Sequence, residues 1–424
     1  MNFFLLVLFV VFSGYLQAQK NVIYCGKLID AASNTVMTAK TIIVEGNKIA
    51  EGKDGYATPG ATDQLFDFKN KTVMPGLMDM HVHLETQTKK NAVADRLSTE
   101  AQDIAFSAVN YTYVTLMAGF TTVRDLGGTG VNISLNNAIN NGTTIGPRIY
   151  TDGKSIATTG GHADPTNGLK RSFGGDPGPI EGVVKGVDEF SKAVRQRYKD
   201  GADLIKITAT GGVLSQAKGG SGAQFSEEEI RAIVTTAKDY GFKVAAHAHG
   251  AEGMKRAIRG GVNSIEHGTF MDDECIGLFK KYGTWLVPTI IAGKSTADSA
   301  KIPGYYSAIV TPKALATGPK TQVTFTKAYK AGVKIAFGTD AGVFMHGKNY
   351  LEFQYMTEGG MPAMEAIQSA TINAATLLGV ENTLGSTQKD ELADIIAVDG
   401  DPLKDILVMG KVVFVMKDGK VFKK

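Results

Sequence analysis

The sequence predicts an α/β protein: a (β/α)8 barrel of the TIM type with a small β-sandwich domain formed from both termini. Between about residues 75 and 380, short apolar runs alternate with longer amphipathic segments, which is typical of repeated βα units. Before and after that region, β-branched runs alternate with polar turns instead. The 424 residues are enough for a barrel of about 250 residues and a smaller accessory domain.

Residues 1–18 are predicted to be a signal peptide. Phe3 to Phe12 (FFLLVLFVVF) is an apolar run too short to cross a bilayer of roughly 30 Å as a helix, and Ala18 offers a small residue for cleavage. No Lys or Arg precedes the run, and Leu16 stands where a second small residue is usual, so a retained N-terminal membrane anchor is the alternative. We therefore expect an exported chain, periplasmic or secreted, with no stable membrane insertion after cleavage.

Residues 19–74 and 384–424 are predicted to form the small β domain together. Asn21 to Leu28 (NVIYCGKL) and Thr41 to Glu45 (TIIVE) have the composition of strands. Near the other end, Ala393 to Val398 (ADIIAV) and Val412 to Met416 (VVFVM) do as well, separated by an Asp-Gly-Asp-Pro turn. Strands at both ends, with a different pattern between them, indicate that the termini meet beside the central domain.

Residues 75–383 are predicted to form the barrel. One of its helices should run from Ser226 to Tyr240, because Ser226 and Glu229 have capping-box spacing and Gly241 follows. The eight candidate strands end near His83, Asp125, Gly153, Thr208, His247, His267, Thr289 and Asp340.

Composition argues against several function classes. The formal charge of +3 is spread along the chain without a Lys/Arg run, so we expect no nucleic-acid partner. The two cysteines, Cys25 and Cys275, cannot build a disulfide framework or a cysteine metal site. There is no G-x-S-x-G elbow, and the glycine-rich loop Ala209 to Gln224 does not match a phosphate-binding loop.

Catalytic groups of a βα barrel collect at the carboxyl ends of its strands, and that is where the metal-binding side chains of this sequence fall. All seven histidines lie in the predicted barrel. His81 and His83 are two apart on one strand, so both imidazoles can reach one ion. Three more candidates, His247, His267 and Asp340, each end a separate apolar run. These five side chains, from separate parts of the sequence, all fall at predicted strand ends, and this pattern predicts a metal centre.

The segments MDMHVHLE, DLIKITATGG with Lys206, VAAHAHG, SIEHGT and FGTDAG together resemble the amidohydrolase superfamily. Within it, the chain is similar to the prolidase-like, imidazolonepropionase-related dipeptidase group, over nearly the whole mature chain. The resemblance implies two divalent metal ions. His81, His83 and Asp340 would bind the more buried ion, His247 and His267 the second, and a Lys206 carboxylated by CO2 would bridge them.

The surroundings of Lys206 agree with that implication. Lys206 lies in an apolar run, Leu204 to Ile207, where a bare ammonium would be costly to bury. A carbamate would turn it into an oxygen ligand; the alternative is an amine that pairs with a carboxylate. Zinc is the default metal for imidazole and oxygen ligands, with manganese, cobalt and iron left open.

Further residues are expected to contact substrate. His162, in the loop SIATTGGHADP, is expected to act in catalysis by donating to the scissile carbonyl, and His249 to bind substrate. Asp340 is expected both to ligate and to move a proton to the leaving amine. Arg124 is expected to pair with Asp125 or another carboxylate, and the loop after Lys206 could serve as a lid.

These inferences predict a binuclear-metal amidohydrolase that releases a C-terminal amino acid from dipeptides, Xaa-Pro or other, or from N-acyl amino acids. Two alternatives stand beside it: a cyclic-amide hydrolase of the imidazolonepropionase kind, and a catalytically silent barrel that acts as a binding protein. The expected partner is a small molecule or dipeptide. Sequence leaves the oligomeric state open, a homo-oligomer included.

Overall fold

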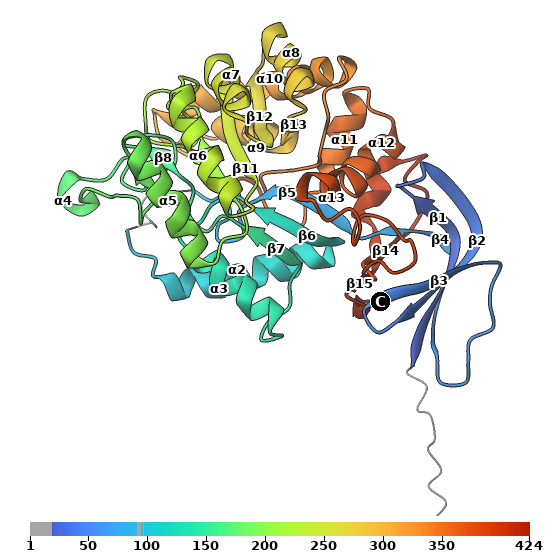
Figure 1. Ribbon diagram of the computed structural model, residues 1–424. Coiled ribbons are helices and arrows are strands. Elements are labelled where there is room, and N and C mark those ends of the chain that lie inside the picture. Colours follow the sequence, from blue (N-terminus) through green and yellow to red (C-terminus); the bar gives the residue numbers. More distant parts are fainter. Residues whose placement is uncertain (1–18, 91–94, 96) are drawn as a thin grey trace, which may run out of the picture.

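The computed structural model describes residues 19–90, 95 and 97–424, and it contains the predicted barrel and the predicted terminal β domain (Figure 1). The predicted signal peptide, residues 1–18, lies outside the described residues. Within the described ranges, no helix combines the length and apolar character needed to cross a membrane.

The terminal domain is one seven-stranded sheet to which both ends of the chain contribute. Its order is β16-β15-β14-β4-β1-β2-β3. The antiparallel pairing of β4 with β14 joins the two contributions, as predicted (Figure 1). The strands are β1 (Lys20–Asp30), β2 (Thr35–Glu45), β3 (Lys48–Asp54), β4 (Gln64–Pro75), β14 (Ile395–Val398), β15 (Val412–Lys417) and β16 (Lys420–Lys423).

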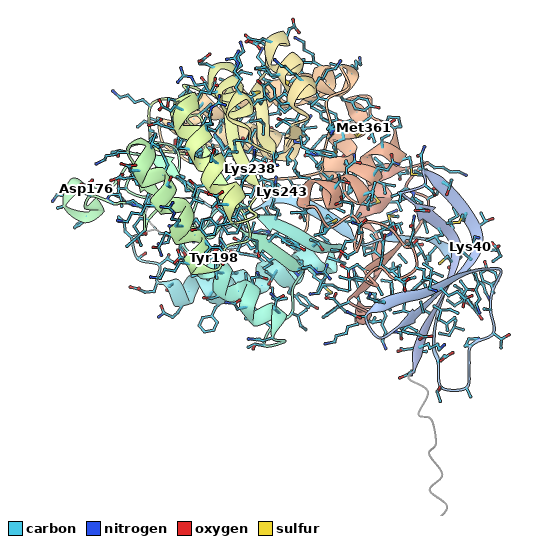
Figure 2. The ribbon with its side chains drawn as sticks, in the orientation of Figure 1. Lys40, Asp176, Tyr198, Lys238, Lys243 and Met361 are labelled. Carbon is cyan, nitrogen blue, oxygen red and sulfur yellow. The ribbon has the colours of Figure 1, made fainter. Side chains whose placement is uncertain are left out.

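One face of this sheet encloses its own apolar core. Ile23 and Ile42 are buried in that core, and the Phe66 ring of β4 lies 5.1 Å from the Phe414 ring of β15. Polar side chains such as Lys40, which pairs with Asp54, lie on the outer side of the sheet (Figure 2). Other residues of the same sheet, among them Met74, Ile396 and Val415, belong to the main apolar core of the barrel, so the sheet shares that core.

Parallel strands form the barrel in two hydrogen-bonded groups. The first group has the order β5-β6-β7 and the second β10-β11-β12-β13. The strands are β5 (Leu77–Val82), β6 (Phe120–Asp125), β7 (Arg148–Thr151), β10 (Ile205–Thr208), β11 (Val244–Gly250), β12 (Ser264–Phe270) and β13 (Trp285–Val287).

Single parallel bridges close the barrel where regular strands are interrupted. Ile156 pairs with Ile207 between the two groups, Leu286 pairs with Ile335, and Val82 pairs with Ala341. The eighth predicted strand is thus the segment 335–341, which has bridges but no regular ladder. Its pairing is irregular near Asp340, which has a φ of 61°. The Thr339 amide donates to the Asp79 carboxylate at 3.0 Å as well as to the His81 carbonyl of β5 at 3.3 Å.

Helices surround the barrel strands (Figure 1). The predicted helix is present as α6, in which Ser226 accepts from the Glu229 amide while the Glu229 carboxylate accepts from the Ser226 amide. The helices are α2 (Ala101–Met117), α3 (Val131–Asn140), α4 (Arg171–Gly174), α5 (Gly186–Asp200), α6 (Glu227–Asp239), α7 (Ala251–Gly260), α8 (Asp273–Tyr282), α9 (Ile290–Ala300), α10 (Val310–Lys330), α11 (Leu351–Glu358), α12 (Ala363–Ser369) and α13 (Ile372–Leu378). Two short strands, β8 (Ala157–Thr158) and β9 (Val183–Val184), form a separate parallel pair.

Candidate metal centre

The carboxyl ends of the barrel strands bring all six predicted ligands to one cavity of about 190 Å³. The ligands come from five strands that are far apart in the sequence, so the barrel closure itself assembles them. They are His81, His83, Lys206, His247, His267 and Asp340. His162 and His249 line the same cavity.

A first group of ligand atoms converges on the Asp340 carboxylate. Potential ligand atoms of His81, His267 and Asp340 lie within 4.8 Å of one another. His83 Nε2 lies 3.2 Å and His81 Nε2 3.6 Å from Asp340 Oδ1. Two ring nitrogens and a carboxylate that face one point form a donor set suited to a divalent cation.

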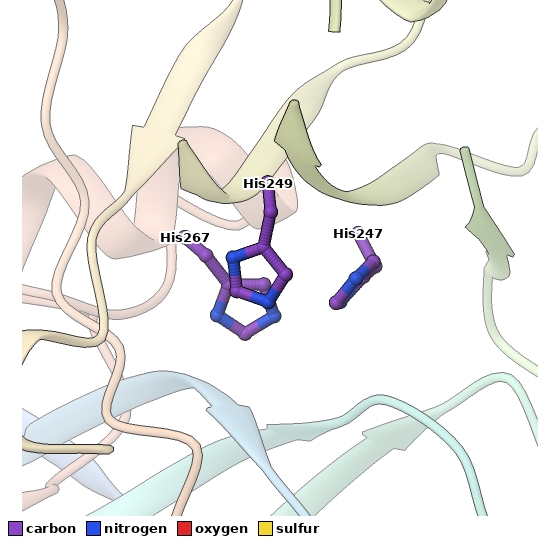
Figure 3. A group of neighbouring side chains, drawn as sticks. All are labelled: His247, His249 and His267. Atoms are coloured by element: carbon purple, nitrogen blue, oxygen red, sulfur yellow. The ribbon is translucent and has the colours of Figure 1, made fainter. Parts of the chain in front are cut away.

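A second group consists of His247, His249 and His267, whose ligand atoms also lie within 4.8 Å of one another (Figure 3). The rings of His249 and His267 are stacked with centroids 4.9 Å apart, and His247 is edge-on to both. The sequence predicts only a substrate-binding role for His249, whereas the structure places it within one group of potential metal ligands. Its predicted role as a substrate contact stays a prediction.

Hydrogen bonds fix which nitrogen of each imidazole remains free. His83 Nδ1 donates to the Gly127 carbonyl at 2.9 Å, and His247 Nε2 donates to the Gly211 carbonyl at 3.1 Å, because a carbonyl can only accept. His81 Nδ1 lies 3.0 Å from the Glu266 carboxylate, and His267 Nδ1 lies 2.7 Å from Thr289 Oγ1. In His81, His83 and His247, whose partners are carboxylate or carbonyl acceptors, the opposite nitrogen is left as a lone pair, the arrangement typical of metal-ligating histidine.

Burial sets the protonation of these groups. It lowers the pKa of His81, His247 and His267 well below the ordinary value, so these rings are neutral as metal ligands must be. Burial also acts to lower the pKa of His83, but the hydrogen bond and charge of Asp340 outweigh it and the pKa is raised. Asp340 shows the converse: burial acts to raise its pKa, but His81 and His83 lower it, so the carboxylate is anionic.

Lys206 is buried in an environment that does not suit an ammonium. Burial lowers its pKa, and Nζ has a single long contact, 3.4 Å to the Leu126 carbonyl. No carboxylate of the described residues lies within ion-pair distance of it, which argues against the alternative of a simple lysine–carboxylate pair. A buried amine with a lowered pKa, close to the imidazoles, is the kind of lysine that could carry a carbamate.

The structure also places the remaining sequence candidates. The His162 ring lies 4.3 Å from the His247 ring, its Nδ1 has no hydrogen-bond partner, and burial lowers its pKa to about 3. Arg124 pairs with a carboxylate as expected: it binds Glu266 at 2.8 Å rather than Asp125. His346 lies outside the cavity and donates to the Thr86 carbonyl.

Sequence reasoning missed the residues that support the ligands. Glu266 directly precedes His267, and a buried acid in an apolar strand was the available signal. Thr289 gave no signal beyond ending a predicted strand. Three strand-end residues, His267, Thr289 and Asp340, have φ values of 73°, 49° and 61°, and such left-handed conformations of non-glycine residues concentrate at functional sites.

Comparisons with known proteins agree with this geometry. The model of the amidohydrolase family matches residues 72–422. A solved Xaa-Pro dipeptidase with methionine bound in its active site has 53% sequence identity and a TM-score of 0.94, covering 96% of this chain and 100% of that one. A prolidase complexed with N-methylphosphonate-L-proline has 31% identity and a TM-score of 0.88, covering 96% of this chain and 100% of its own.

Among curated proteins, the ochratoxinase of Aspergillus niger is 32% identical over 434 aligned residues, which cover 96% of this chain and 87% of the relative. These relatives, together with the two histidine groups, make the protein a metal-dependent hydrolase of carbon–nitrogen bonds rather than a catalytically silent barrel. The chain belongs to the amidohydrolase family.

Proposed function

We propose that the protein is a dipeptidase that cleaves the peptide bond of dipeptides, Xaa-Pro among them, and releases the C-terminal amino acid. The main support is the 53% identity, over 96% of the chain, to a structure described as a Xaa-Pro dipeptidase with bound methionine in the active site. The cavity of about 190 Å³ favours a small substrate over an extended polypeptide.

We further propose that the six converging side chains hold two divalent cations, with zinc as the default. His81, His83 and Asp340 would bind one ion, and His247 and His267 the other, with a carboxylated Lys206 between them. The free lone pairs of His81, His83 and His247, and the burial of Lys206 with a lowered pKa, support this assignment. When bound, two divalent cations supply Lewis acidity toward the scissile carbonyl and the attacking water.

Asp340 is the residue best suited to move the proton. Its Oδ1 is buried, has no fully formed hydrogen bond and faces the cavity, and the neighbouring rings keep its pKa below the ordinary value. An anionic carboxylate in that position accepts a proton from the attacking water and returns it to the leaving amine.

His162 and His249 are proposed to bind substrate. Burial lowers their pKa values to about 3 and about 4, so both rings are neutral hydrogen-bonding groups at pH 7. His162 would donate to the scissile carbonyl. The cavity lining of the described residues holds no Arg and no Lys except Lys206, which is assigned to the metal ions. The neutral rings are therefore the groups left in that lining to receive the free α-carboxylate of a dipeptide.

A substrate panel tests the proposal with purified, metal-analysed protein. Dipeptides with C-terminal proline or methionine, matching N-acyl amino acids and a small cyclic amide are assayed for release of free amino acid or ring opening. We expect kcat/KM for dipeptides to exceed that of the other two classes by at least about tenfold. Ring opening without dipeptide cleavage would support the cyclic-amide alternative instead.

We also propose that the chain is exported, on the apolar run from Phe3 to Phe12. Mass spectrometry of the chain recovered from the extracytoplasmic fraction tests this. A mature mass that begins after residue 18 supports export with cleavage, whereas an intact N-terminus in the membrane fraction supports the retained anchor.

A further inference from the structure

One wall of the cavity is formed by a loop, residues 211–217, that begins three residues after the end of β10. Val213 and Leu214 of this loop line the cavity together with residues of α9 and α10. Val213 is buried against Ala300 and Ala314, and Leu214 and Tyr306 pack on the same cluster. The loop thus has an apolar side that faces two helices as well as the site.

A single lysine of α10 binds the backbone of this loop at three points. Lys313 Nζ donates to the carbonyls of Gly212 at 3.0 Å, Ser215 at 2.7 Å and Ala217 at 2.9 Å. An ammonium has three N–H donors, so these carbonyls use all of them. In the part of the chain that the structure describes, no carboxylate lies within ion-pair distance of Lys313, so the loop carbonyls are its partners.

The same loop touches the metal centre. The Gly211 carbonyl accepts from His247 Nε2 at 3.1 Å, and the next carbonyl, that of Gly212, is bound by Lys313. A Cβ at Gly212 would lie 2.1 Å from His162 Cε1, so the loop backbone is packed directly on that ring. The position of the loop therefore sets the position of two site histidines.

The chemistry of the cavity lining points to the side chains that it accepts. Apart from the histidines, Lys206 and Asp340, the lining consists of aliphatic and small hydroxyl residues. A charged substrate side chain against Val213, Leu214 and Val343 would be buried without a partner, which is costly.

We infer that Lys313 is a positioning and specificity-determining residue: it fixes residues 211–217 so that Val213 and Leu214 form an apolar wall that selects substrates with uncharged, apolar side chains. The substrate class rests on the proposed dipeptidase function. The contact between Lys313 and the loop is independent of that proposed function.

Limited proteolysis tests the positioning role without any activity assay. Lys218 is exposed at the end of the loop and offers a trypsin site. In metal-loaded Lys313→Met, cleavage after Lys218 should be about tenfold faster than in the wild type, because loss of a hydrogen-bonded cation frees the loop. Lys320→Met, at an exposed position of the same helix, should leave the rate unchanged.

Equal cleavage rates for Lys313→Met and the wild type would overturn the positioning role. Lys313→Gln, whose side-chain amide keeps two N–H donors but no charge, serves as a second variant if Lys313→Met does not fold. It should give an intermediate rate.

A kinetic comparison tests the specificity role. The wild type should cleave dipeptides with C-terminal Met or Leu at least about tenfold better, in kcat/KM, than those with Glu or Lys. In Lys313→Met and Leu214→Ser this ratio should fall toward one, through a higher KM for the apolar substrates and a smaller change in kcat.

The two possible failures are distinguishable. If the wild type cleaves charged and apolar dipeptides equally, the specificity inference fails and the dipeptidase function stands. If it cleaves no dipeptide, the proposed function and the substrate class fail together, while the rate of cleavage after Lys218 still decides the positioning role.

Discussion

At the scale of single residues, the metal centre depends on side chains that never face the cavity. Glu266 has no exposed surface and contacts His81 Nδ1 through one oxygen and Arg124 through the other. Ser264 donates to the same carboxylate at 2.6 Å. This buried network holds His81 so that its Nε2 is directed to Asp340. Within the network, the Arg124 guanidinium balances the charge of the Glu266 carboxylate.

Glu266→Gln should weaken metal binding. The amide cannot supply the charge that orients His81 and balances Arg124, so we expect the affinity for zinc to fall about 10–100-fold. Titration with a competing chelator measures the affinity. Glu274→Gln, at a position of α8 outside the cavity, is the control. An unchanged affinity in Glu266→Gln would contradict the orienting role of the carboxylate.

Lys206→Ala should abolish hydrolysis, and added bicarbonate should not restore it, because the side chain that would carry the carbamate is gone. We expect turnover to fall by at least about a thousandfold while circular dichroism shows a folded chain. Lys238→Ala, an exposed lysine on α6, should behave like the wild type (Figure 2). Near-normal turnover in Lys206→Ala would refute the bridging assignment.

His247, His267 and Asp340 could be predicted from sequence because each ends an apolar run, a pattern that is local. Their partners could not. Glu266 lies 185 residues from His81, and Lys313 lies about a hundred residues from the carbonyls that it binds, so only the folded barrel reveals these contacts. The bare sequence also could not show that His249 joins His247 and His267.

At the scale of elements, the start of α9 is held by a residue of α11. Glu352 accepts hydrogen bonds from the amides of Ile290 at 2.8 Å and Ile291 at 2.7 Å, the first residues of α9. Thr289, which precedes them, has a φ of 49° and binds His267. Helix α6 was predictable because its capping box is local, whereas this long-range cap left no pattern in the sequence.

Glu352 should make stability depend on pH. Burial raises the pKa of its carboxyl from the ordinary 4.5 to about 8, although both backbone hydrogen bonds act against the shift. The folded state keeps a proton that the unfolded state has released between these values, so this residue lowers the free energy of unfolding as pH rises from 4.5 to 8. Glu352→Gln has no ionisable group at this position, so its stability lacks this dependence on pH. The Tm of the variant minus the Tm of the wild type should therefore increase from pH 5 to pH 8. A constant difference between the two would contradict the raised pKa.

At the scale of the whole molecule, the terminal domain and the barrel are joined by a buried ionic cluster. Arg148 on β7 binds Asp394 at 3.0 Å and Asp418 at 2.5 Å, and both acids belong to the C-terminal part of the sheet domain. The meeting of the two termini was predictable from strand patterns. The cluster was not, because 246 residues separate Arg148 from Asp394.

Arg148→Met should destabilise the protein by about 3 kcal/mol, since Asp394 would be left buried without its cation. Denaturant unfolding measures the change. Arg231→Met, which removes an exposed pair with Glu227 on α6, should cost less than about 0.5 kcal/mol. Equal costs for the two variants would show that the cluster is not a structural joint.

The pairing of β4 with β14 also governs the order in which a newly made chain can fold. Until residues 395–398 are synthesised, the first four strands have an unsatisfied edge at β4, and the last step of assembly brings together segments from opposite ends of the polypeptide. Completion of this sheet therefore waits for the whole barrel to be made, and a chain cut short before β14 would carry an open strand edge prone to aggregation.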